Sequence, residues 1–151
     1  MTLTTEMKKQ KDGHVIECIR NDAQFDLEIS LHCHEFTFNC PSAQQPDFGT
    51  VLITYIPDKR IAETKALKFY LQKYRYRNSF NEELTIRIMQ DFVFYVQPKK
   101  VVVTLAQTSR GGIQNTCKSN YDQDDEKCVS AMLNYKPKTN FRGGWPMLKT
   151  K

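Results

Sequence analysis

A thiol and a carboxylic acid lie close together in this sequence, in a loop bounded by prolines. Cys40 is followed by Pro41, and Asp47 is preceded by Pro46. A thiolate attacks an electron-poor carbon, and a nearby carboxylic acid can deliver the proton that completes the addition. The same spacing fits an inert, half-buried thiol beside a turn-forming Pro-Asp pair, so these residues alone leave both interpretations open.

The segments on either side of this loop have the pattern of β-strands. From residue 26 apolar residues alternate with polar ones, which is typical of a strand with one buried face. Residues 49–56 form a second β-rich run that ends at Pro57. The predicted buried face of the first strand consists of Leu27, Ile29, Leu31 and Cys33.

Two helices are predicted next, over residues 61–76 and 79–96, and Pro98 ends the second. Ser79 and Glu82 have the spacing of a capping box at the start of the second helix. The apolar positions recur at helical spacing: Leu67, Tyr70, Leu71 and Tyr74 in the first helix, and Leu84, Ile88, Met89, Phe92, Val93 and Val96 in the second.

Two further strands, 101–105 and 113–119, flank a turn at Arg110-Gly111-Gly112. The order strand, strand, helix, helix, strand, strand predicts an α+β domain in which two helices cover one face of an antiparallel four-stranded sheet. We expect a polar arm over residues 1–25, the folded domain over 26–119 and a loose tail over 120–151. Trp145 is a candidate anchor of that tail on a neighbouring subunit.

The composition indicates one globular domain. The chain has 151 residues, of which 40% are hydrophobic, and a net charge of +5 with a sequence pI near 8.9. This modest positive charge favours an anionic small ligand over a dedicated nucleic-acid surface. Five irregularly spaced cysteines, without a signal-peptide core or an apolar run of membrane-spanning length, predict a reduced, cytoplasmic protein.

Five segments together resemble a known family. They are Cys40-Pro41, Gln45-Pro46-Asp47-Phe48, Glu63-Thr64-Lys65-Ala66-Leu67-Lys68-Phe69-Tyr70, Tyr76-Arg77-Asn78 and Arg110-Gly111-Gly112. In this order they are similar to the motifs of the NADPH-dependent 7-cyano-7-deazaguanine reductases, the QueF nitrile reductases of queuosine biosynthesis. The resemblance extends from about residue 35 to residue 119, and the length matches the short, single-module type.

The resemblance implies a fold and a chemistry. The fold is the tunnelling fold, in which several subunits join their sheets into a barrel and active sites form at subunit interfaces. Cys40 is implied to add to the substrate nitrile as a covalent thioimide, and Asp47 to give a proton to the nitrile nitrogen. Asp47 should then be protonated near neutral pH, in an apolar setting that Phe36, Phe38 and Phe48 could provide. NADPH supplies the hydrides, and no metal is expected.

The resemblance also implies which residues bind the ligands. The 7-deazaguanine is expected at Ala62, Glu63, Thr64 and Glu82, where a carboxylate suits the two N–H groups of a guanine-like edge. Lys65 and Lys68, one helical turn apart, suit the cofactor phosphates, with Arg110 as a weaker candidate. Asn81 is a weaker candidate for a substrate contact, because it stands where the family usually has a histidine. Asparagine can hydrogen-bond a substrate but cannot carry a proton or a charge at neutral pH.

Three alternatives remain open at this point. A related tRNA amidinotransferase group uses the same Cys and Asp but lacks the lysine-bearing block, and it would imply a nucleic-acid partner, which we otherwise do not expect. His32 and His34 lie two apart on a strand and could belong to a pterin-type metal site, although the remaining histidine, His14, lies in the polar arm. The third alternative is a binding module that keeps the substrate pocket but does not catalyse the reaction, and Asn81 is the residue that supports it.

Overall fold

A four-stranded antiparallel sheet forms one layer of the protein. The computed structural model describes residues 15–43 and 45–138. The strand order is β2-β3-β5-β6, and each strand runs antiparallel to its neighbours. Their bounds are Ile29–Asn39 for β2, Pro46–Ile56 for β3, Lys100–Gln107 for β5 and Thr116–Asp122 for β6. The predicted α+β class and antiparallel sheet are therefore confirmed.

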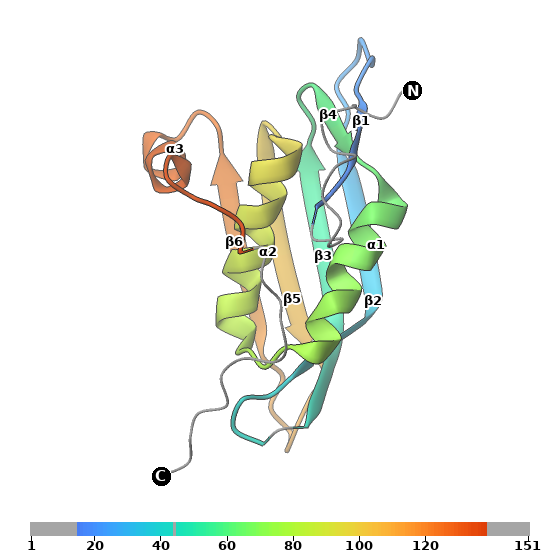
Figure 1. Ribbon diagram of the computed structural model, residues 1–151, viewed down its shortest axis with the longest axis vertical. Helices are drawn as coiled ribbons and strands as arrows, with labels where there is room; N and C mark the ends of the chain where they lie inside the picture. Colours follow the sequence, from blue (N-terminus) through green and yellow to red (C-terminus); the bar gives the residue numbers. More distant parts are fainter. Residues whose placement is uncertain (1–14, 44, 139–151) are drawn as a thin grey trace.

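Two helices cover one face of this sheet (Figure 1). They are α1 (Thr64–Gln72), which continues into a 3₁₀ turn at Lys73–Tyr76, and α2 (Asn81–Val96). No helix in the described residues is long and apolar enough to cross a membrane. The predicted helical stripes are buried against the sheet, with Met89 at their edge. Their buried members are Leu67, Tyr70, Leu71, Tyr74, Leu84, Ile88, Phe92, Val93 and Val96, and they share the core with Val101, Val103 and Leu105 of β5.

A bulge in β2 changes which positions face the core. The register of β2 against β3 shifts between Cys33 and Phe36. Before the shift, Ile29, Leu31 and Cys33 are half-buried against the core, as the alternation predicts. After it, the even-numbered Phe36 and Phe38 are fully buried, because the extra residue of a bulge reverses the sides of a strand. The expected strand start at residue 26 is wrong, since β2 begins at Ile29 and Leu27 is exposed.

Two short strands form a separate ribbon beside the main sheet. β1 (Cys18–Arg20) pairs antiparallel with β4 (Arg60–Ala62). Ile16 and Cys18 are buried in the core. The predicted polar arm is therefore wrong for residues 15–20, because a three-residue strand is too short to show a pattern in the sequence. Residues 1–14 lie outside the part of the chain that the structure describes.

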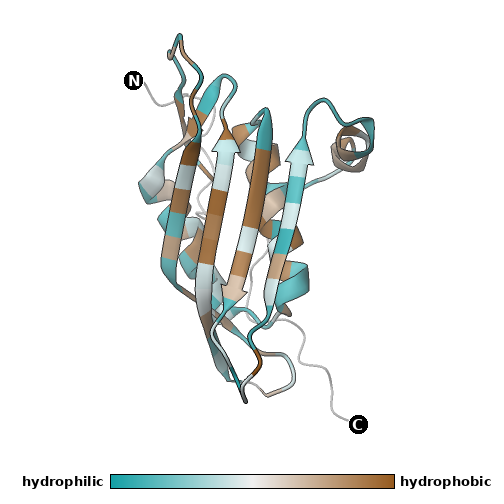
Figure 2. Cartoon of the chain, turned by 180° about the vertical axis from the view of Figure 1, so that it is seen from behind, coloured by the Kyte–Doolittle hydropathy of each residue, from teal (hydrophilic) through white to brown (hydrophobic). Residues whose placement is uncertain are grey.

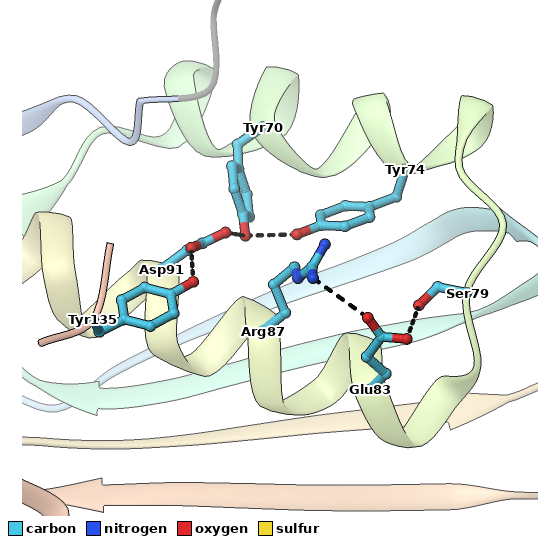
Figure 3. Close-up of polar contacts among 7 residues, drawn as sticks. All are labelled: Tyr70, Tyr74, Ser79, Glu83, Arg87, Asp91 and Tyr135. Carbon is cyan, nitrogen blue, oxygen red and sulfur yellow. Dashed lines mark hydrogen bonds and ion pairs between the residues drawn. The ribbon is translucent and has the colours of Figure 1, made fainter. Parts of the chain in front are cut away.

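The segment after residue 120 also differs from the expected loose tail. β6 continues to Asp122, and α3 (Glu126–Met132) follows, with Asp125 capping it by accepting a hydrogen bond from the Lys127 amide. Beyond α3, the Tyr135 hydroxyl donates to the Asp91 carboxylate of α2 (Figure 3). The expectation of a loose segment is wrong for residues 120–135, and Trp145 lies outside the described residues.

Both helices begin later than the sequence predicts. α1 starts after Glu63, and residues 61 and 62, expected in the first helix, belong to β4 (Arg60–Ala62) instead. The N-cap of α2 is Phe80, which makes no capping side-chain hydrogen bond, so the Ser79–Glu82 capping box is wrong. The Ser79 amide donates instead to the Asn39 carbonyl at 3.0 Å, and this bond holds Ser79 before the helix.

Among the described residues, no helix covers the other face of the main sheet. Figure 2 shows this face, on which β6 is mostly hydrophilic. Ser30, Thr54, Val102 and Asn120 follow one another across the four strands in paired register. β2 and β6 are the outer strands of this sheet, so each has one side without a strand partner among the described residues. Such strand edges invite pairing with another chain.

Candidate active site

The hairpin between β2 and β3 places Cys40 at one end of the sheet. Asn39 pairs with Pro46, and the Cys40 amide donates to the Gln45 carbonyl at 2.9 Å, which closes the loop. Residue 44 of this loop lies outside the described residues. Cys40 itself is a half-buried free thiol. The loop thus keeps the sulfur within reach of a small molecule without exposing it fully.

The segment between α1 and α2 anchors the base of the Cys40 loop. The Asn39 amide donates to the Arg77 carbonyl and the Asn39 carbonyl accepts from the Ser79 amide, both at 3.0 Å. The Asn39 side-chain amide donates to the Arg75 carbonyl at 3.1 Å. Asn39 and Asn78 form a parallel bridge. These bonds give the Tyr76-Arg77-Asn78 motif a physical role, because they fix the residue next to Cys40.

Asp47 lies on the same hairpin, on the buried side of β3. It pairs with Phe38 in the register of the two strands, and its side chain is 6% exposed. Its carboxylate faces a cation: Nη1 of Arg110 donates to Oδ1 at 2.8 Å and to Oδ2 at 3.0 Å. The expected apolar surroundings are therefore wrong in one respect, and Phe48 points outward, 54% exposed. With both oxygens accepting from a guanidinium, Asp47 has the geometry of a carboxylate ion.

Arg110 reaches Asp47 from the turn between β5 and β6. Arg110 and Ile113 exchange two backbone hydrogen bonds, of 2.9 and 3.0 Å. Gly111 and Gly112 both have positive φ, at 56° and 78°, as the tightest hairpin turns require. The predicted Arg-Gly-Gly turn is confirmed. The contact with Asp47 was not predicted, because both helices lie between the two residues along the sequence.

Glu82 and Asn81 lie at the start of α2, near the same hairpin ends. The Asn115 side-chain amide donates to Glu82 Oε1 at 2.9 Å. Asn81 is buried, and its side-chain amide donates to the Asn115 carbonyl at 3.2 Å and, weakly, to the Leu105 carbonyl at 3.5 Å. Its Oδ1 accepts from the Thr85 hydroxyl at 3.1 Å. Asn81 thus ties α2 to the sheet. No sequence signal pointed to Asn115 as the residue that holds both.

The remaining predicted residues surround the start of α1. Both carboxylate oxygens of Glu63 cap the helix, accepting from the amides of Lys65 and Ala66 at 2.9 and 2.8 Å. Thr64, Lys65 and Lys68 are exposed, and the Lys68 ammonium lies 5.1 Å from the centre of the Phe69 ring. Ala62 is buried and its amide donates to the Tyr55 hydroxyl at 3.1 Å.

The predicted residues therefore fall into two groups within one chain. Cys40 and Asp47 belong to the β2–β3 hairpin, Arg110 of the β5–β6 turn bonds to Asp47, and Glu82 lies in the first turn of α2. Figure 1 shows these hairpin ends and the start of α2 at one end of the molecule, with the start of α1 farther up. The helical segment from residue 64 to residue 76 separates Glu63 from that end by roughly 20 Å, at 1.5 Å per residue. One chain does not bring the two groups together.

The other cysteines and the histidines give little support to a rival site. Burial raises the pKa of Cys18 to about 11 and also raises the pKa of Cys33 and Cys117, which disfavours their thiolates. His32 and His34 stack on each other at 5.8 Å on the exposed side of β2. The described residues contain no group of three side chains that could hold a metal ion.

Comparisons with known proteins agree with this arrangement of motifs. The sequence model of the family described as QueF-like protein matches residues 46–126. An NADPH-dependent 7-cyano-7-deazaguanine reductase of Rhodopirellula baltica is 49% identical over 90 residues, 60% of this chain and 74% of the relative. The reductase of that name from Bacteroides fragilis is 34% identical over 136 residues, 87% of this chain and 90% of the relative.

A solved structure shares the fold at lower sequence similarity. The apo form of an archaeosine synthase QueF-Like superposes with a TM-score of 0.58 at 20% identity, covering 66% of this chain and 95% of that protein. At this identity the likeness bears on the fold alone. The matched family, the extent of the relatives' alignment and the order of the motifs agree. The chain belongs to the family of NADPH-dependent 7-cyano-7-deazaguanine reductases.

Proposed function

We propose that this protein is an NADPH-dependent oxidoreductase that reduces the nitrile of 7-cyano-7-deazaguanine to the 7-aminomethyl group, in the pathway to queuosine in tRNA. The proposal is supported by the β2–β3 hairpin, which carries both Cys40 and the buried Asp47, in a chain whose relatives are named NADPH-dependent 7-cyano-7-deazaguanine reductases. The overall reaction adds two hydrides from two NADPH and two protons to one nitrile.

Cys40 is the proposed nucleophile. Its sulfur forms a bond to the nitrile carbon while one carbon–nitrogen π bond breaks. The electron pair of that bond moves to the nitrogen, which takes up a proton, and the product is a thioimide. The sulfur leaves again as thiolate once the carbon has gained hydrogen. The bonds from Asn39 to the α1–α2 connection hold the loop during these changes. A fixed loop keeps the sulfur oriented toward the substrate, which lowers the entropic part of the activation free energy for the attack.

Asp47 is the proposed proton carrier, with a role that the contact with Arg110 modifies. As an ion it first takes the proton of the Cys40 thiol, which generates the thiolate. After the sulfur has attacked the carbon, Asp47 returns the same proton to the nitrile nitrogen. This sequence needs no proton from solvent, and it replaces the expectation that Asp47 is protonated before the substrate binds.

The exposed lysines of α1 fit the phosphates of NADPH. Lys65 and Lys68 lie one helical turn apart, and both are exposed. When bound, NADPH supplies the hydrides of the reaction. Neighbouring Glu63 and Thr64, with Ala62, are the proposed substrate contacts at this end, and Glu82 is the proposed contact at the other. Glu63 must exchange its capping bonds for the N–H groups of the base in order to bind it.

An oligomeric barrel would bring the two groups of residues together. The roughly 20 Å between the start of α1 and the Cys40 loop is too long for one small base to bridge within a chain. Pairing of the outer strands β2 and β6 between copies would extend the sheet and place neighbouring chains side by side. We therefore propose the tunnelling fold, with active sites shared between subunits.

The reductase function is tested by following NADPH absorbance after addition of 7-cyano-7-deazaguanine. NADPH should be consumed at two molecules per nitrile, with the aminomethyl base as product and no requirement for ammonia or RNA. Ammonia-dependent conversion without NADPH consumption would establish the amidinotransferase alternative. A covalent adduct that never turns over would establish the binding module.

Asn115→Ala is expected to weaken substrate binding. It removes the hydrogen bond to Glu82 Oε1, so the carboxylate proposed to contact the substrate loses its support. A hydrogen bond to a charged group contributes roughly 1.5 kcal/mol, so the KM for the nitrile base should rise about tenfold while kcat changes less. Steady-state kinetics at saturating NADPH measure both. Asn120→Ala, an exposed asparagine on β6, the strand that begins just after Asn115, is the control and should leave KM unchanged. An unaltered KM in Asn115→Ala would contradict the role of Glu82.

A further inference from the structure

The ion pair between Asp47 and Arg110 joins a buried anion to a half-exposed cation. The Asp47 side chain is 6% exposed and that of Arg110 is 54% exposed. Removing an unpaired carboxylate from water carries a high free-energy cost, which a hydrogen-bonded cation offsets. In the described part of the chain, Arg110 is the ion-pair partner that the structure gives to Asp47. Arg110 therefore supplies the counter-charge to the buried Asp47 carboxylate.

The backbone fixes the position from which Arg110 acts. The Thr108 amide donates to the Phe48 carbonyl at 2.8 Å, which ties the start of the turn to the residue after Asp47. At Gly49 the backbones of β3 and β5 approach so closely that a Cβ would lie 2.6 Å from the Ala106 carbonyl oxygen. The two strands thus hold the backbones near Arg110 and Asp47 in place, and the Arg110 side chain completes the contact.

We propose that Arg110 is a positioning residue for the covalent step: it pairs with the Asp47 carboxylate and holds it in one orientation, ready to take the thiol proton of Cys40. This inference rests on the proposed function, because the covalent step is the addition of Cys40 to a nitrile. It differs from a role in binding cofactor phosphates, the role that the sequence suggested for Arg110. Thioimide formation consumes no NADPH, so the two roles affect different steps.

The test measures the covalent step by itself. Wild-type protein is mixed with 7-cyano-7-deazaguanine without NADPH, quenched at intervals and analysed by intact-mass spectrometry. Arg110→Gln should slow adduct formation by about 100-fold, in the range that proton transfer contributes. Arg110→Lys retains a cation and should remain within about tenfold of wild type. Millimolar guanidinium should restore part of the rate to Arg110→Gln, whereas urea should not.

A surface variant and a melting curve complete the experiment. Arg20→Gln removes an exposed arginine that pairs with Asp22, and it should form the adduct at the wild-type rate. A wild-type rate of adduct formation in Arg110→Gln, with a raised KM for NADPH, would overturn the proposal in favour of cofactor binding. A slow variant with a lowered melting temperature that neither lysine nor guanidinium rescues would also overturn it. Absence of any adduct on the wild type would instead refute the proposed function, and the positioning role with it.

Discussion

Cys40→Ala should form no covalent adduct with 7-cyano-7-deazaguanine and should consume NADPH at least about a thousandfold more slowly than the wild type, because loss of a nucleophile removes the covalent pathway entirely. Intact-mass spectrometry detects the adduct, and NADPH absorbance gives the rate. The fold should remain intact, since the loop is held by backbone bonds of Asn39 and Cys40 and not by the sulfur.

The remaining cysteines provide matched controls for this variant. Cys117→Ala and Cys33→Ala each remove a half-buried thiol whose pKa is raised by burial, and both should keep the adduct. Cys40→Ser tests whether a hydroxyl can replace the thiol, and it should be nearly as inactive as Cys40→Ala, because serine is a far weaker nucleophile without a strong base. An adduct that persists on Cys40→Ala would assign the chemistry to another residue.

Asp91→Ala should destabilise the fold by about 3 kcal/mol, the lower end of the cost of breaking a buried charged network. Asp91 is 4% exposed, and its carboxylate accepts hydrogen bonds from Tyr70, at 2.5 Å, and from Tyr135 (Figure 3). The Tyr70 and Tyr74 hydroxyls are themselves bonded at 2.9 Å. Alanine would leave two tyrosine hydroxyls without this acceptor. Urea unfolding followed by circular dichroism measures the change.

Tyr135→Phe is the graded control for this network. It removes one hydroxyl and keeps the ring, so the loss should be about 1 kcal/mol. Asp91 joins α2 to α1 through Tyr70 and to the segment after α3 through Tyr135, so it connects three parts of the chain. If Asp91→Ala unfolds at the wild-type urea concentration, these hydrogen bonds do not contribute to stability.

The same carboxyl should make stability depend on pH. Burial raises the pKa of Asp91 above 3.8, although hydrogen bonds from Tyr135 and Tyr70 and the charges of Arg87 and Arg77 oppose the shift. Between 3.8 and the raised pKa the folded protein holds a proton that the unfolded chain has lost. This contribution to stability is complete below 3.8 and is lost as the pH rises through the folded pKa. Asp91→Asn should flatten the pH dependence of the urea midpoint in that range, and an unchanged slope would assign it to other groups.

The main architecture was predictable because its patterns are long. The stripes of α1 and α2 repeat over several turns and are buried as expected, and the apolar run 101–105 lies within β5. The bulge in β2 was not predictable, since one extra residue leaves no mark in composition. The ribbon of β1 and β4 was not predicted for a similar reason, because each of its strands has only three residues.

Sequence reasoning proposed the residues of the candidate site but not their contacts. Cys40 and Asp47 are close in the sequence, and one hairpin carries both. Arg110 meets Asp47 through the pairing of β3 with β5, which local patterns do not specify. Tyr135 is a single aromatic residue in a polar segment, and its hydrogen bond to Asp91 depends on how the chain returns after α3. Long-range pairings of this kind require the fold to be known.

Asn81 shows how a departure from the family pattern can be interpreted from structure. The sequence left open whether an asparagine at this position permits turnover. The structure buries it, with its amide donating to the Asn115 carbonyl of the hairpin and its oxygen accepting from Thr85. A side chain with these bonds supports the start of α2, on which Glu82 lies. In the proposed mechanism the proton transfer therefore depends on Asp47 and Arg110, and Asn81 carries no proton.

The most direct test of the nitrile reductase function follows hydrogen from cofactor to product. The protein is incubated with 7-cyano-7-deazaguanine and NADPH deuterated at the position that is transferred, and the base is analysed by mass spectrometry. We predict the aminomethyl base with two deuterium atoms on its methylene carbon, because both hydrides come from NADPH. A base recovered as unchanged nitrile, or as an amidine without deuterium, would contradict the proposed function.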